Sequence, residues 1–227
     1  MKALLQRPIA HRGLHDNKFI VENTLESFNA AIKSKFPIEC DIVLSKDEEV
    51  IVFHDYDLKR LANINKSIDN FRTDELRKIN LLETKSVISS VDEVLHKVKG
   101  EVPILIEIKE SFNCKIEERL FEIIRSYDGE IAIQSFDSKS IRWFKENAPF
   151  FKLGLVSRST NLTIEEVNKL GVDFVSFDIN ILESDIVKKT KSMGFHILTW
   201  TVDTNEKYQK SLRFADNCIF QNIKFDN

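Results

Sequence analysis

The chain has 227 residues, a formal net charge of −3 and a pI near 6.0, and 42% of its residues are hydrophobic while 30% are charged. This length suits one large domain or two small ones, and the hydrophobic share is sufficient for a substantial core. The near balance of acidic and basic residues argues against a nucleic-acid-binding protein and against a polybasic membrane-binding patch.

Targeting segments and disulfides are not indicated by the sequence. The N-terminal stretch MKALLQRPIAHRG has no apolar run long enough for a signal peptide, and no later segment is apolar enough to span a bilayer. The 3 cysteines, Cys40, Cys114 and Cys218, lie far apart and form no CxxC pair. We therefore expect a reduced, cytoplasmic protein without stable membrane association or a nucleic-acid partner.

Short apolar runs alternate with amphipathic stretches along the whole chain. The apolar runs, which we predict to be strands, are Pro8–Ala10, Ile38–Leu44, Val50–Phe53, Pro103–Ile108, Ile131–Gln134, Lys152–Val156, Phe174–Phe177, Ile197–Trp200 and Asn217–Phe220. The stretches with helical spacing are Thr24–Lys35, Val91–Val98, Lys115–Ser126, Ser138–Asn147, Thr163–Leu170, Glu183–Met193 and Asn205–Phe214. No linker or change in composition marks a domain boundary.

Residues at the ends of these stretches support the helix predictions. Thr24, Ser138 and Thr163 precede or begin helical patterns, where a hydroxyl can accept a hydrogen bond from the first turn. Gly171 and Gly194 follow two of the helices, where a left-handed backbone conformation is favoured.

This alternation predicts parallel strands joined by helical crossovers. About eight strands in a chain of this length favour a single TIM-type (β/α)8 barrel over residues 1–227 rather than an open sheet. Segment 57–90 fits the alternation poorly. We expect it to form a small insertion after the second strand region, above one rim of the barrel.

Acidic residues interrupt the apolar runs at three positions. Glu39 and Asp41 lie within IECDIVLSKDEEVIVFHD, residues 38–55, and Glu107 lies near the end of a later strand. Residues two apart on a strand point to the same face, and the C-terminal ends of barrel strands meet at one mouth. Three carboxylates in such a mouth cannot all stay ionised without a cation. Because oxygen ligands suit hard ions, we predict one bound divalent cation, Mg²⁺ or Ca²⁺.

Basic residues and histidines occur at the same predicted strand ends. Arg12 and Lys109 flank the expected metal site and together indicate a pocket for a phosphate group. His11 and His54 can serve as general acid and general base, and the sequence does not show which residue has which role. The set as a whole is typical of phosphoryl transfer.

The same motifs resemble those of the glycerophosphodiester phosphodiesterase family over essentially the whole chain. In order, they are HRG, ENTLESF, IECDIVLSKDEEVIVFHD, LIEIK, QSF and TWTVD. The resemblance implies a TIM barrel that hydrolyses a small-molecule glycerophosphodiester to sn-glycerol 3-phosphate and an alcohol, with one metal ion and two histidines. The attacking group is then water or a neighbouring glycerol hydroxyl, and both remain open.

Roles for individual residues follow from the resemblance by position. It implies that His11 and His54 are catalytic, that Glu39, Asp41 and Glu107 bind the metal, that Arg12 and Lys109 contact the phosphate, and that Phe136 and Trp200 form an aromatic wall near the glycerol. The chain departs from the family pattern at Gln221 and Asn222, where Thr-Asp is usual. This departure leaves the shape of the pocket rim, and therefore the leaving alcohol, open.

Other interpretations also remain open. The acidic residues could form a buried salt-bridge cluster with Arg12 and Lys109. The same scaffold could act on lipids as a lysophospholipase D or a sphingomyelinase-D-like enzyme, or could be a non-catalytic binding module, although both histidines are present. His15 lacks a nearby cysteine or third histidine, so we interpret it as a loop residue and not a zinc ligand. The oligomeric state is not indicated.

Overall fold

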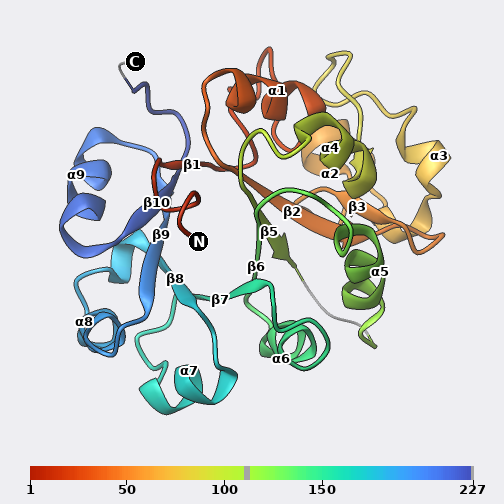
Figure 1. The fold of residues 1–227 in the computed structure, drawn as a ribbon. Helices are drawn as coiled ribbons and strands as arrows, with labels where there is room; N and C mark the ends of the chain where they lie inside the picture. Colours follow the sequence, from red (N-terminus) through yellow and green to blue (C-terminus); the bar gives the residue numbers. More distant parts are fainter. Residues whose placement is uncertain (110–112, 226–227) are drawn as a thin grey trace.

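The computed structural model describes residues 1–109 and 113–225, and its centre is a closed barrel of eight parallel strands (Figure 1). The barrel strands are β1 (Ile9–Ala10), β2 (Ile38–Leu44), β5 (Ile104–Ile108), β6 (Ile131–Ser135), β7 (Lys152–Ser157), β8 (Phe174–Asp178), β9 (His196–Val202) and β10 (Asn217–Phe220). They pair in this order, and β1 closes the ring by pairing with both β10 and β2. The predicted TIM-type barrel is confirmed.

Helices surround the barrel on its outside (Figure 1). They are α1 (Leu25–Lys33), α4 (Val91–Val98), α5 (Lys115–Ile124), α6 (Ser138–Asn147), α7 (Ile164–Leu170), α8 (Asp185–Ser192) and α9 (Asn205–Phe214), with a short 3-10 helix η2 (Ile179–Ile181) after β8. Thr24 and Thr163 cap α1 and α7 as predicted, and Gly171 ends α7 in the left-handed conformation. The prediction for Ser138 is wrong, because the side chain of Asp137 accepts the capping hydrogen bond of α6.

The insertion after β2 lies beside the barrel and has a small core of its own. It begins with β3 (Val50–Val52), which pairs antiparallel with β2, and ends with β4 (Ser89–Ser90), which pairs antiparallel with β3. Between them lie the short helices α2 (Lys59–Ala62), η1 (Ile68–Asn70) and α3 (Thr73–Leu76). The predicted strand Val50–Phe53 therefore exists but does not join the barrel ring.

Two buried layers hold the barrel together. Cys40, Ile106 and Ile133 point outward from β2, β5 and β6 into the layer between strands and helices, as alternation predicts. Inside the barrel, Leu105, Phe174 and other side chains form a separate apolar cluster. This cluster fills the interior below the carboxylate-bearing positions, so a polar site can form only at the mouth above it. Among the described residues, no helix is long and apolar enough to cross a membrane.

Candidate active site

Three buried carboxylates meet at the C-terminal mouth of the barrel. Glu39 and Asp41 project from β2, and Glu107 projects from β5 directly opposite Asp41 in the strand pairing. Each carboxylate offers an oxygen that lies within 4.8 Å of the others, and the residues are only 1%, 2% and 7% exposed. Among the described residues, no other group of three such side chains has this geometry.

Basic side chains neutralise this acidic group only in part. Nε of Arg12 lies 3.0 Å from Oδ2 of Asp41, and Nζ of Lys109 lies 3.3 Å from Asp41 and 2.8 Å from Glu107. Glu39 accepts the backbone N–H of Arg12 at 2.9 Å but has no cationic side-chain partner among the described residues. The alternative of a self-contained salt-bridge cluster therefore leaves one buried carboxylate, Glu39, without an ion pair among the described residues.

The pKa values of these groups follow from the same imbalance. Burial raises the pKa of Glu39 well above its usual value, and repulsion from Asp41 and Glu107 raises it further. Burial and Asp41 likewise raise the pKa of Glu107. Burial would also raise the pKa of Asp41, but Arg12 and Lys109 together hold it below its usual value. Buried, mutually repelling oxygen ligands with incomplete neutralisation fit a hard divalent cation.

The HRG turn explains how Arg12 reaches three acidic residues, Glu39, Asp41 and Glu22. Arg12 and Gly13 both adopt a positive φ, of 56° and 79°. A Cβ on Gly13 would lie 2.7 Å from the backbone of Ser27, so only glycine fits at this position. The turn directs the backbone N–H of Arg12 at Glu39, while Nη1 of its side chain lies 2.7 Å from Glu22.

The two histidines have different hydrogen-bond partners. Nδ1 of His11 lies 2.7 Å from Oε1 of Gln221, which is a neutral amide oxygen. Burial, and next the neighbouring Arg12, lower the pKa of His11 to about 4. Nδ1 of His54 instead lies 2.6 Å from a carboxylate oxygen of Asp55. The two rings therefore differ in the charge of the group beside Nδ1, which is a neutral amide oxygen for His11 and a carboxylate for His54.

Arg60, from the insertion, links Glu22, the partner of Arg12, to Asp55, the partner of His54. Its Nη1 and Nη2 donate to the two carboxylate oxygens of Glu22 at 2.9 and 2.7 Å, and its Nε donates to Asp55 at 2.7 Å. Burial acts to raise the pKa of Asp55, but hydrogen bonds from His54 and Arg60 lower it to about 2. Sequence reasoning missed Arg60, because it lies in the segment that the strand–helix alternation did not explain.

Aromatic residues form the other side of the mouth. Phe136 follows β6 and Trp200 lies on β9, and their rings meet edge to face with centroids 5.5 Å apart. Trp200 donates its indole N–H to the carbonyl of Ser176 at 3.0 Å, which fixes the ring. Arg158, which sequence reasoning also missed, lies over both rings, with its guanidinium carbon 4.9 Å from the Phe136 centroid and 5.6 Å from that of Trp200.

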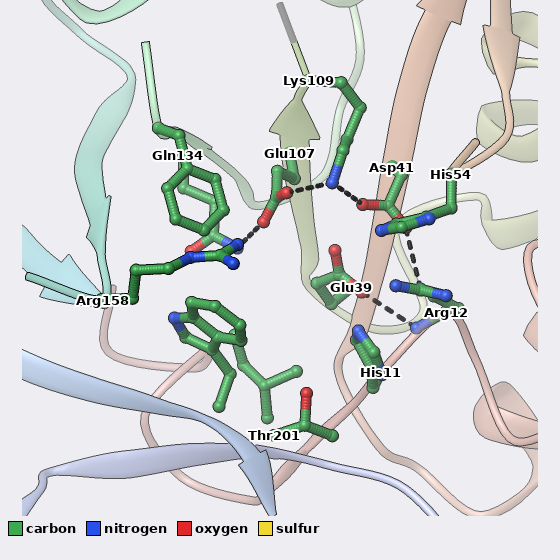
Figure 2. Close-up of a pocket in the computed structure, with 13 residues that line it drawn as sticks. His11, Arg12, Glu39, Asp41, His54, Glu107, Lys109, Gln134, Arg158 and Thr201 are labelled. Atoms are coloured by element: carbon green, nitrogen blue, oxygen red, sulfur yellow. Dashed lines mark hydrogen bonds and ion pairs between the residues drawn. The ribbon is translucent and has the colours of Figure 1, made fainter. Parts of the chain in front are cut away.

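All nine residues predicted for the site line one pocket (Figure 2). They are His11, Arg12, Glu39, Asp41, His54, Glu107, Lys109, Phe136 and Trp200, and Gln134, Arg158, Thr201 and Ile219 complete the lining. Gln134 donates its amide to Glu107 at 3.0 Å, which holds that carboxylate in place from the neighbouring strand. His15 lies in an adjacent depression with Asp16 and Asn17, outside this pocket.

Comparison with known proteins gives the family. The model of the glycerophosphoryl diester phosphodiesterase family matches residues 11–222. A glycerophosphodiester phosphodiesterase of Caldanaerobacter subterraneus is 31% identical over 94% of this chain and 91% of its own length. A lysophospholipase D of Rattus norvegicus is 29% identical over 63% of this chain and 50% of its own length.

A solved structure shares the fold. A phosphodiesterase of Oleispira antarctica, in complex with the product sn-glycerol 3-phosphate, superposes with a TM-score of 0.87 at 19% identity, over 97% of this chain and 94% of the other. The family match over nearly the whole barrel agrees with the acidic site at its mouth. This chain therefore belongs to the glycerophosphodiester phosphodiesterase family and is a phosphodiester hydrolase.

Proposed function

We propose that this enzyme hydrolyses glycerophosphodiesters to sn-glycerol 3-phosphate and an alcohol, with residues 1–227 acting as one catalytic domain. The observation that carries the proposal is the buried group of Glu39, Asp41 and Glu107, with two histidines and two basic side chains lining the same pocket. The product bound to the Oleispira antarctica structure, sn-glycerol 3-phosphate, agrees with this choice of substrate.

The three carboxylates would hold one divalent cation, Mg²⁺ or Ca²⁺, because their oxygens converge and are incompletely neutralised. When bound, such an ion supplies positive charge to the phosphate oxygens. Arg12 and Lys109 border the same place and contribute further charge and hydrogen bonds to the phosphate. Their ion pairs with Asp41 hold both side chains in position before substrate arrives.

We assign the general base to His11 and the general acid to His54. The amide oxygen of Gln221 can only accept a hydrogen bond, so Nδ1 of His11 carries the proton and Nε2 is free to accept one from the attacking hydroxyl. Asp55 accepts from Nδ1 of His54 and orients the ring, which would donate a proton to the leaving alcohol. Water and the glycerol 2-hydroxyl both remain suitable attackers.

Turnover of glycerophosphocholine tests the proposal. Choline and sn-glycerol 3-phosphate should appear in equal amounts, stop on addition of EDTA, and resume when Mg²⁺ or Ca²⁺ is added back. If no glycerophosphodiester is cleaved with either metal, the proposed function is wrong.

A second candidate is a lysophospholipase D, favoured by the similarity to the Rattus norvegicus enzyme. It would use the same residues on a substrate whose glycerol carries an acyl chain. Choline release from lysophosphatidylcholine, compared with release from glycerophosphocholine, distinguishes the two.

A further inference from the structure

Arg158 is a cation at the pocket mouth that the reaction above does not use. It follows β7, which ends at Ser157, and its side chain is exposed and lines the same pocket as the carboxylates. Figure 2 shows its guanidinium directed into the pocket from the side opposite Arg12 and His54. It is therefore placed to contact a part of the substrate that extends away from the two histidines.

Arg158 differs from the other two basic side chains of the pocket in its partners. Arg12 and Lys109 both form ion pairs with Asp41. Among the described residues, Arg158 forms neither an ion pair nor a hydrogen bond, and its contacts are with the faces of Phe136 and Trp200. The planar guanidinium has five N–H donors, and among the described residues none of them is used in a hydrogen bond while the group lies over the rings.

The position of Arg158 also makes Phe136 and Trp200 less accessible to an apolar ligand. Without it, Phe136 and Trp200 would present adjacent apolar faces at the pocket mouth, a surface suited to a hydrocarbon chain. With the guanidinium over both rings, an acyl chain could reach them only by displacing the cation and losing both cation–π contacts. A glycerol hydroxyl, in contrast, can accept a hydrogen bond from the guanidinium where it lies.

We propose that Arg158 is a specificity-determining residue that selects substrates with an unesterified glycerol and rejects those with an acylated one. The proposal rests on the proposed function, since it names which diesters the site accepts. It predicts an enzyme for deacylated, water-soluble glycerophosphodiesters, in which one side chain separates this activity from that of a lysophospholipase D.

The test compares two substrates that share the bond cleaved and the product measured. Choline release is followed from glycerophosphocholine and from a short-chain lysophosphatidylcholine kept below its critical micelle concentration. We expect the wild type to have the higher kcat/KM for glycerophosphocholine. Arg158→Leu should shift the ratio of the two kcat/KM values toward the acylated substrate by about tenfold, the size expected from two cation–π contacts.

Two further variants separate specificity from general damage. Arg158→Lys retains the charge but not the planar guanidinium, so its ratio should lie between those of the wild type and Arg158→Leu. Arg213→Leu is the matched control, because Arg213 is also exposed and lies 5.8 Å from the ring of Phe214, on helix α9 and outside the pocket. It should leave both kcat/KM values unchanged.

Two outcomes would overturn the proposal. An equal loss on both substrates in Arg158→Leu would mean that Arg158 binds the phosphate they share, and an unchanged ratio would mean that it does not select. If the wild type releases choline from neither substrate, the proposed function fails separately. Calorimetric binding of sn-glycerol 3-phosphate and of short-chain lysophosphatidate then tests Arg158, and equal discrimination by wild type and Arg158→Leu would refute its role.

Discussion

The two sides of the barrel mouth are built in different ways. On the side of β1, β2, β5 and the insertion, nearly every charged group has a partner, in a continuous chain from Arg60 through Glu22 and Arg12 to Asp41. On the side of β6 to β9, Phe136, Trp200 and Arg158 contact one another but form no ion pair among the described residues.

In the proposed reaction the two sides of the mouth meet different requirements. One side holds the groups at the phosphate, and the other contacts the variable part of the substrate. Groups that act on the phosphate must be held in fixed positions, and shared hydrogen bonds provide this. Groups that contact the variable part of the substrate need only shape and charge, so single substitutions there can change specificity without disturbing the chemistry. Substitutions of the partnered residues test this contrast.

The largest effect is expected from removing one of the carboxylates that we propose to bind the metal. Glu39→Gln should abolish metal-dependent turnover, because Glu39 is the acid without a cationic side-chain partner among the described residues. The wild type should gain about 2.7 kcal/mol of stability at a metal concentration 100-fold above Kd, as measured by thermal unfolding, and the variant should gain much less. Glu122→Gln, an exposed acidic residue on α5, serves as control. Equal metal stabilisation of Glu39→Gln and wild type would contradict the assignment.

The next effect concerns the two histidines. His11→Ala and His54→Ala should each lower kcat by at least ~100-fold, the range expected for a general acid or base. His196→Ala provides a matched control, since His196 lies at the start of β9 and is 48% exposed. Steady-state kinetics with saturating metal measure the effect. Near-normal kcat in either pocket variant would remove that histidine from the mechanism.

A smaller effect is expected from breaking the link between the insertion and the site. Arg60→Gln should lower kcat by about tenfold, because Glu22 and Asp55 both lose a charged hydrogen-bond donor. Combining it with Asp55→Asn should cost less than the sum of the two single effects, since both act through His54. Arg77→Gln, which breaks an exposed ion pair between the insertion and Glu93 of α4, should have no effect on kcat. Additive losses would show that Arg60 does not act through Asp55.

The smallest effect is a shift in pH dependence. A general base must be unprotonated, so activity that depends on His11 is present above its pKa of about 4 and is lost as the pH falls through that value. Gln221→Glu replaces the amide partner of Nδ1 with a carboxylate, which stabilises the charged ring and raises this pKa. The acid limb of the profile of kcat/KM against pH should then move upward by about one unit, with metal saturating throughout. An unmoved limb would indicate that another group controls it.

The amino-acid sequence alone determined what depends on local periodicity. Alternation along β2 places Glu39 and Asp41 on one face and Cys40 on the other, whatever the remainder of the chain does. The same reasoning predicted the helices around the barrel and the polar residues at its strand ends. The expectation that parallel strands end at one mouth brought together His11, Arg12, Glu39, Asp41, Glu107 and Lys109, whereas Phe136 and Trp200 were implied by the family resemblance.

Only the tertiary structure decided which distant groups become partners. Gln221 meets His11 across 210 positions of sequence, and Arg60 meets Glu22 across 38. The pairing of β3 against β2, and the cation–π contacts of Arg158 with Phe136 and Trp200, likewise depend on ring closure and loop paths. Periodicity specifies which way a side chain faces, but the partner it meets depends on how separate strands are brought together, and no local pattern encodes that.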